Sequence, residues 1–208
     1  MHESSVSAIT QGWLTGASLI MAIGAQNALV LRQGLLRNHV AAVVGLCVLS
    51  DVLLICLGVF GLGTLISTHP LLLNLFRWAG AMLLLFYGWL AAQRAWVGQS
   101  GLVAGATASS LRATLGSALV LTFLNPHVYL DTLVLLGMLG AQYSLDLRWA
   151  FALGAGLASL MWFSLLGFGA AAAAGPLNRP GVWRGLDAGV ALLMFVLGLQ
   201  LLATPIRV

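Results

Sequence analysis

Lysine is absent from this chain, and charge of either sign is scarce. Only 7% of the residues are charged, against about a quarter in a typical soluble domain. So few charges cannot cover a soluble surface, whereas 61% of the residues are hydrophobic. These shortages exclude a soluble globular protein and predict an integral membrane protein.

Other absent features exclude particular classes of function. The two cysteines, Cys47 and Cys56, share one apolar run without the spacing of metal ligands, so they are interpreted as small buried hydrophobes. The nine basic residues, all arginine, are scattered at segment ends rather than gathered in a stripe, so nucleic acid is not expected as a partner. No glycine-rich loop carries the Lys-Ser/Thr pair of a phosphate cradle, which excludes direct use of ATP by this chain. With no nucleophile–base constellation either, we expect neither an enzyme nor a cofactor or resident metal.

Apolar runs of about 20 residues are long enough to cross the hydrocarbon core of a bilayer. They cover about 8–31, 40–66, 71–93, 113–139, 149–174 and 182–204. The start of the chain has no Lys or Arg before its first run, so that run is predicted to remain a transmembrane helix rather than a cleaved signal. We therefore expect an all-α, multi-pass membrane protein of about six transmembrane helices.

The two halves of the chain resemble each other weakly. A linker at about 97–112 separates a first repeat, about 6–96, from a second, about 113–208, within one transporter domain covering 1–208. Phe60-Gly61 corresponds to Phe168-Gly169, and polar breaks occur at 24–27 and 125–127. Because three spans per half is an odd number, the halves would be two inverted three-helix repeats, an architecture common among secondary transporters.

Arginine placement predicts the orientation. Most arginines follow the first, third and fifth spans, and fewer lie on the opposite side. Loops that are rich in arginine usually face the cytoplasm. This bias predicts that both termini lie outside.

Asp51 lies near the centre of the second span, where a carboxylate costs about 2.5–3.5 kcal/mol on insertion scales and usually has a function. One structural alternative is a pair with Arg77 or with a backbone donor. A carboxyl in a dry bundle can also be protonated, a property that suits a proton-coupled carrier.

Asp131 belongs to a polar group in the fourth span, together with Asn125, Pro126, His127 and Tyr129. The proline ring excludes one helical hydrogen bond and frees the carbonyl four residues back. His127 and Asp131 are four residues apart and would share a helical face, while Tyr129 can offer its hydroxyl to a neighbouring helix. The group predicts a site for a cation or a hydrogen-bond donor. The alternative is a proline kink whose polar neighbours satisfy one another.

A second group of polar residues ends the first span. Gly24 permits unwinding or close approach of the backbone, and the adjacent amides of Gln26 and Asn27 can bind the carboxylate or ammonium of an amino acid. Hydrogen bonding between helices is the alternative role.

Two further features are interpreted as structural. Asp187 is expected to favour the start of its helix or to pair locally, next to Arg184. Small residues of the fifth span, Gly154, Ala155 and Ser159 among them, are expected to pack against another helix.

At these residues the chain resembles the LysE family of bacterial amino-acid exporters, in particular its lysine and arginine exporter branch. The resemblance covers nearly the whole chain and rests on these strings: Ile23-Gly24-Ala25-Gln26-Asn27, Arg32-Gln33-Gly34, Ser50-Asp51, Arg77-Trp78-Ala79-Gly80, Leu124-Asn125-Pro126-His127-Val128-Tyr129-Leu130-Asp131-Thr132, Gly140-Ala141-Gln142-Tyr143, Trp162-Phe163 and Gly167-Phe168-Gly169. Ala25 departs from the family, which usually has proline there, and leaves the first break to Gly24 alone.

The resemblance implies a bacterial inner-membrane exporter of arginine or lysine, with Asp51 and Asp131 as the essential carboxylates. Its partners would be the basic amino acid, protons and the bilayer, and a homodimer is compatible with a bundle this small. We expect proton antiport, because moving a cation out of a negative interior costs about 2.3 kcal/mol per 100 mV. Export of neutral amino acids or homoserine, or of a divalent metal ion by the same Asp, Asn and His groups, remains an alternative.

Overall fold

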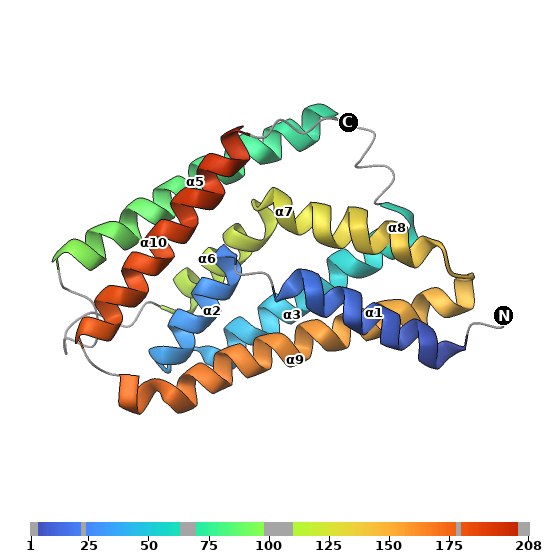
Figure 1. Ribbon diagram of the computed structural model, residues 1–208, viewed down its shortest axis with the longest axis horizontal. Coiled ribbons are helices and arrows are strands. Elements are labelled where there is room, and N and C mark those ends of the chain that lie inside the picture. The colour runs from blue at the N-terminus through green and yellow to red at the C-terminus, as the bar shows by residue number, and fades with distance from the viewer. Residues whose placement is uncertain (1–3, 22–23, 63–69, 98–109, 178–179, 204–208) are drawn as a thin grey trace.

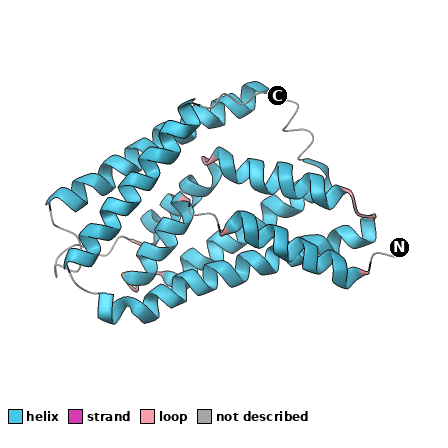
Figure 2. Ribbon diagram, viewed as in Figure 1, coloured by secondary structure: helices cyan, strands magenta, loops and turns pink. Residues whose placement is uncertain are grey.

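The computed structural model of the protein describes residues 4–21, 24–62, 70–97, 110–177 and 180–203, and all regular structure in these ranges is helical (Figures 1 and 2). The predicted all-α fold class is therefore confirmed. The elements in order are α1 (Ser5–Ile20), α2 (Ala25–Leu35), α3 (Val40–Leu57), the π-helical η1 (Gly58–Leu62), α5 (Pro70–Val97), α6 (Leu111–Phe123), α7 (Pro126–Tyr129), the π-helical η2 (Leu130–Leu135), α8 (Leu136–Ala141), α9 (Leu145–Leu177) and α10 (Pro180–Ala203). Most of the predicted linker, 97–112, lies outside the described residues.

Two described segments are long and apolar enough to cross a membrane, namely Val40–Gly61, with a mean hydropathy of 2.7, and Leu145–Gly175, with a mean hydropathy of 1.7. The pair α1 and α2 provides a third candidate if it is counted as one broken span. The outward faces of the helices are apolar as well. Leu49, Leu153, Leu165 and Leu192 each expose more than half of their surface, which a water-facing protein of this size would avoid. The chain is therefore a membrane protein.

The first predicted span, 8–31, is two helices rather than one. α1 ends at Ile20, α2 begins at Ala25, and their axes differ by 82°. Gly24 precedes α2 in an extended conformation, with φ −125° and ψ −179°, and a Cβ there would meet no atom within 4 Å. Of the two roles considered for Gly24, the backbone does leave the helical conformation here, but no atom approaches closely enough to require glycine. Ala25 occupies the first helical position, where proline is also well tolerated.

The fourth predicted span, 113–139, is also divided. α6 ends at Phe123, and Pro126 begins the new helix α7 instead of kinking a continuous one. A proline inside a helix removes one backbone hydrogen bond and clashes with the carbonyl four residues back. In the first turn of a new helix the proline N–H would have had no intrahelical partner, so neither penalty applies. The predicted break at 125–127 is therefore present, whereas the alternative of a proline kink within one helix is not. α7 then passes into η2, and α8 completes the segment.

Small residues bring α1 and α9 into close contact along their length (Figure 1). A Cβ on Gly154 would overlap the carbonyl oxygen of Ile9, and one on Gly12 would overlap that of Phe151. A Cβ on Gly16 would lie 2.9 Å from the Cα of Ala155. The predicted packing role of Gly154 and Ala155 is confirmed.

α5 and α10 lie side by side as a second pair (Figure 1). Arginine side chains also bind backbone carbonyls of neighbouring helices. Arg184, near the start of α10, donates to the carbonyls of Ala95 and Trp96 at 3.2 and 3.3 Å, at the end of α5. Arg37, after α2, donates to the carbonyl of Ala171 on α9 at 2.9 Å. The Arg184 guanidinium thus satisfies carbonyls in the last turn of α5, which have no intrahelical partner.

Candidate functional site

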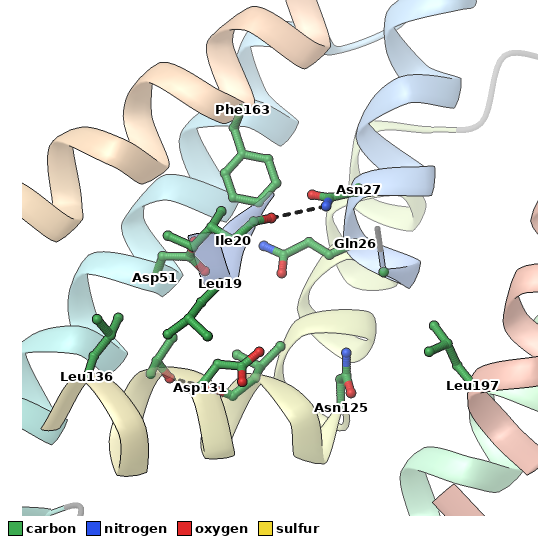
Figure 3. Close-up of a pocket in the computed structure, with 13 residues that line it drawn as sticks. Leu19, Ile20, Gln26, Asn27, Asp51, Asn125, Asp131, Leu136, Phe163 and Leu197 are labelled. Carbon is green, nitrogen blue, oxygen red and sulfur yellow. Dashed lines mark hydrogen bonds between the residues drawn. The ribbon is translucent and has the colours of Figure 1, made fainter. Parts of the chain in front are cut away.

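Both helix breaks open into one cavity of about 180 Å³ (Figure 3). We call it the aspartate cavity, because Asp51 and Asp131 both line it. The complete lining is Leu19, Ile20, Gly24, Gln26, Asn27, Asp51, Asn125, Val128, Asp131, Thr132, Leu136, Phe163 and Leu197. Sequence positions that are far apart, at the start of α2, in the middle of α3 and after the second break, therefore meet at one place.

Asp51 projects from the middle of α3 and exposes only 3% of its surface. Its Oδ2 accepts a hydrogen bond of 2.8 Å from the hydroxyl of Ser159 on α9, which is itself completely buried. A donor from a neighbouring helix is the kind of support that a carboxylate inside a membrane needs. The partner is thus a serine hydroxyl, where we had considered Arg77, whose side chain lies outside the described residues, or a backbone donor.

Gln26 lies in the first turn of α2 and is 93% buried, since 7% of its surface is exposed. Its side chain approaches the carboxyl of Asp51 and the thiol of Cys47, and Figure 3 shows its amide directed into the cavity. Among the described residues its amide nitrogen has no hydrogen-bond partner. A buried unpaired donor costs about 1–3 kcal/mol, and this amide is placed to donate either to the carboxyl of Asp51 or to a ligand in the cavity.

Asn27, the neighbouring residue, has a structural role. Its amide nitrogen donates to the carbonyl of Ile20 at 3.2 Å, and its side-chain oxygen accepts from the indole of Trp162 at 3.3 Å. The first of these bonds closes the end of α1 across the break, and the second fastens the break to α9. The structural role that we considered for the amide pair is therefore present on Asn27, and substrate binding by Gln26 stays a prediction.

Asp131 lies in η2 and is only partly buried. Among the described residues, no side chain donates a hydrogen bond or forms an ion pair with its carboxylate. A π-helical segment, which is frequent at functional sites, carries it. This segment packs tightly on η1, since a Cβ on Gly58 would lie 2.5 Å from the carbonyl oxygen of Thr132. Asp131 is thus held on a rigid element with its carboxylate toward the cavity (Figure 3).

The remaining predicted residues support the second break. The hydroxyl of Tyr129 donates to the carbonyl of Phe123 at 2.6 Å, which satisfies a carbonyl at the end of α6. Asn125 lines the cavity. The side chains of Pro126 and His127 lie outside the described residues, so a shared helical face for His127 and Asp131 stays a prediction.

The structure gives Ser159 and Asp187 hydrogen-bond partners that differ from the roles expected from the sequence. Ser159, assigned to helix packing, is the donor to Asp51. Asp187, expected to pair locally, is 1% exposed and accepts a hydrogen bond of 3.1 Å from Nε of Arg94 on α5. The neighbouring Arg184 instead binds α5 carbonyls.

The charge of the aspartate cavity has one sign. Its polar groups are two carboxylates, three side-chain amides and the hydroxyl of Thr132, and no lining residue is basic. In the described part of the chain, no group of three or more His, Cys, Asp or Glu side chains could hold a metal ion. The arrangement favours a ligand that carries positive charge and several hydrogen-bond donors.

Comparison with known proteins agrees with this chemistry. The chain is 43% identical to the lysine exporter LysE of Corynebacterium efficiens, over 92% of this chain and 96% of that protein. It is 44% identical to the arginine exporter protein ArgO of Yersinia enterocolitica, over 92% of this chain and 94% of that protein. No solved structure matches the chain. The family of LysE type translocators matches residues 17–204, and the chain belongs to this family.

Proposed function

We propose that the protein exports L-arginine, L-lysine or both across the bacterial inner membrane, with Asp51 and Asp131 as the carboxylates that bind substrate and protons. The observation that carries this proposal is the aspartate cavity, where two carboxylates and no basic side chain line one space at the meeting of two helix breaks. An intramembrane carboxylate costs enough to be retained mainly for function. The names of the relatives, a lysine exporter and an arginine exporter, indicate the cation.

The cavity offers complementary groups for each part of a basic amino acid. The two carboxylates can bind the ammonium or guanidinium groups, which are strong donors to carboxylate oxygens. The first turn of α2 opens into the same cavity, and the unpaired N–H groups of a helix start attract a carboxylate. The amide nitrogen of Gln26, buried and without a partner in the described residues, adds a further donor. Broken helices bind substrates in this way in other transporters.

Coupling to protons follows from the energetics of export. Moving one positive charge against the membrane potential costs about 2.3 kcal/mol per 100 mV. Protonation of Asp51 or Asp131 from outside would remove the attraction for the cation and release it. Loss of the proton toward the cytoplasm would restore the site.

We further propose that the chain forms six spans in two inverted repeats. Under this arrangement α3 corresponds to α9, and α5 corresponds to α10. α3 packs against α9, and α5 packs against α10. Elements that are related by a two-fold axis within the membrane can pack in this way. The two breaks, one in each repeat, would meet at the same axis, where transporter sites commonly lie.

The test is transport by Asp51→Asn and Asp131→Asn in inside-out vesicles, where labelled arginine and lysine are taken up from the cytoplasmic face. Each variant keeps the size of the side chain but loses its charge, so we expect loss of uptake with a normal amount of inserted protein. Asp146→Asn, at an exposed aspartate in the first turn of α9, is the control and should transport normally. Normal uptake by either cavity variant would contradict the role of that residue.

Proton coupling has its own test in proteoliposomes. An imposed pH gradient, with the vesicle interior acidic, should accelerate uptake of arginine through protein in the inside-out orientation. A rate that stays the same at every gradient would exclude antiport and leave the substrate assignment intact.

A further inference from the structure

A second cavity, of about 170 Å³, lies toward the other end of α2. We call it the arginine cavity, because Arg32 and Arg94 line it and no lining residue is acidic. Its polar lining also includes Gln33, Tyr87, Thr114 and Ser117. The two cavities thus have opposite charge.

Asp187 holds the two guanidinium groups of the arginine cavity in place. Its Oδ1 accepts a hydrogen bond from Nε of Arg94 at 3.1 Å and lies 3.8 Å from Nε of Arg32. The second distance is an ion pair beyond hydrogen-bond reach. One carboxylate therefore balances two guanidinium groups, and one positive charge is left over.

Three buried polar atoms at or beside this cavity lack a hydrogen bond among the described residues. They are the donor Nε of Arg32, the acceptor Oε1 of Gln33, whose side chain is only 3% exposed, and the acceptor Oδ2 of Asp187. Buried polar groups are nearly always hydrogen-bonded, so each exception calls for an explanation. Nε of Arg32 has its ion pair with Asp187 but no hydrogen bond, and this cationic donor next to the acceptor of Gln33 matches the carboxylate and ammonium of an α-amino acid.

Two helices, α2 and α10, each contribute residues to both cavities. α2 contributes Gln26 and Asn27 to the aspartate cavity and Arg32 and Gln33 to the arginine cavity. The rise of an α-helix puts Gln26 and Arg32 about 9 Å apart, so the cavities are separate sites. α10 runs in the opposite sense, with Met194 in the arginine cavity and Leu197 in the aspartate cavity.

An apolar cluster adjoins the arginine cavity. Its buried members are Ala25, Ala28, Leu84, Leu121 and Met194, of which Ala28, Leu121 and Met194 line that cavity. An ion without hydration enters such apolar surroundings only at a high free-energy cost. A ligand that passes from one cavity to the other would leave a positive site and arrive at a negative one.

We infer that the arginine cavity is a carboxylate-binding station for the exported amino acid, which Arg32 contacts and which selects cations that carry a carboxylate. This inference rests on the proposed function, and the arginine-rich end of the bundle is then the cytoplasmic entrance. Inorganic cations and amines without a carboxylate are repelled by the extra positive charge. An amino acid supplies the neutralising carboxylate itself and leaves its cationic side chain for Asp51 and Asp131.

The test compares arginine with agmatine, the amine that remains when arginine loses its carboxylate. Each is used unlabelled to compete with uptake of labelled L-arginine into inside-out vesicles. In the wild type, arginine should compete about 10-fold to 100-fold better than agmatine, as expected for one charged hydrogen bond. In Arg32→Gln this ratio should fall toward one, because the variant no longer distinguishes a carboxylate.

Arg112→Gln is the matched control, because Arg112 is exposed in the first turn of α6, beside lining residues of the same cavity. It removes the same charge and should keep the wild-type ratio. Arg32→Lys keeps the charge without the Nε donor and should give an intermediate ratio, which decides the question if Arg32→Gln does not insert.

Several results would overturn the inference. They are a wild-type ratio near one, or Arg32 variants that weaken arginine and agmatine equally, as a purely structural ion pair would. If replacing chloride by gluconate reproduced the Arg32→Gln ratio in the wild type, the site would hold a free inorganic anion instead. Wild-type vesicles without arginine uptake would refute the proposed function and this inference with it, whereas normal uptake with an unchanged ratio refutes only the inference.

Discussion

Ser159→Ala tests how the bundle supports the buried carboxylate of Asp51. The substitution removes the hydroxyl that donates to Asp51 at 2.8 Å, at a position where the serine is completely buried. A hydrogen bond to a charged group contributes about 1.5–3 kcal/mol, and each 1.4 kcal/mol is about a factor of ten in affinity. If the ionised form of Asp51 binds substrate, the half-saturating concentration of arginine should rise about 10-fold to 100-fold.

The assay is the initial rate of labelled arginine uptake into inside-out vesicles over a range of concentrations, normalised to inserted protein. Ser164→Ala is the matched control, because it removes a hydroxyl from the same helix at a half-buried position that does not contact Asp51. We expect the control to keep wild-type saturation. Equal saturation of the two variants would refute the idea that Ser159 holds the carboxylate ready for substrate.

Two further predictions concern the packing and the second break. Gly154→Ala should lower the unfolding temperature of the purified protein, because its Cβ would overlap the carbonyl of Ile9 and overpacking costs about 1–3 kcal/mol. Gly45→Ala is the control and should not lower the unfolding temperature, because a Cβ there would meet nothing within 4 Å. Equal losses in unfolding temperature would contradict the close approach of α1 and α9. Tyr129→Phe removes the 2.6 Å bond to the carbonyl of Phe123 and should slow arginine uptake relative to the wild type. A wild-type rate would show that the break does not depend on this hydroxyl.

The sequence was sufficient for the membrane character, the helical fold and the residues at the two breaks. Asp51 and Asp131 could be found because a carboxylate in an apolar run is costly wherever the run packs. Gly24, Gln26, Asn27 and Asn125 were found as polar interruptions of such runs, and with the two aspartates they line one cavity.

What the sequence did not reveal depends on how distant helices pack. Ser159 looks like any small residue of a packed helix until α9 is placed against α3, which brings it to Asp51. The partners of Asp187 lie on α5 and α2, far away in the chain, so a local pairing was the natural but wrong prediction. Gln26 and Asn27 are adjacent and chemically alike, and only the direction in which each points from α2 separates a free donor from a structural bond.

The division of the fourth span also needed the structure. Pro126 predicts a disturbance, but a proline inside a helix and a proline that begins one have the same local sequence signal. The π-helical turns of η2, which carry Asp131, leave no pattern in the sequence that differs from an ordinary helix.

The most direct test of the central claim is competition for uptake of labelled L-arginine into inside-out vesicles that contain the wild-type protein. The proposal predicts saturable uptake that unlabelled arginine or lysine suppresses and that leucine, homoserine and cadmium ions leave unchanged. Uptake no greater than in vesicles without the protein, or uptake that a neutral amino acid or cadmium suppresses as strongly as lysine does, would contradict a cavity built around Asp51 and Asp131 for a basic amino acid.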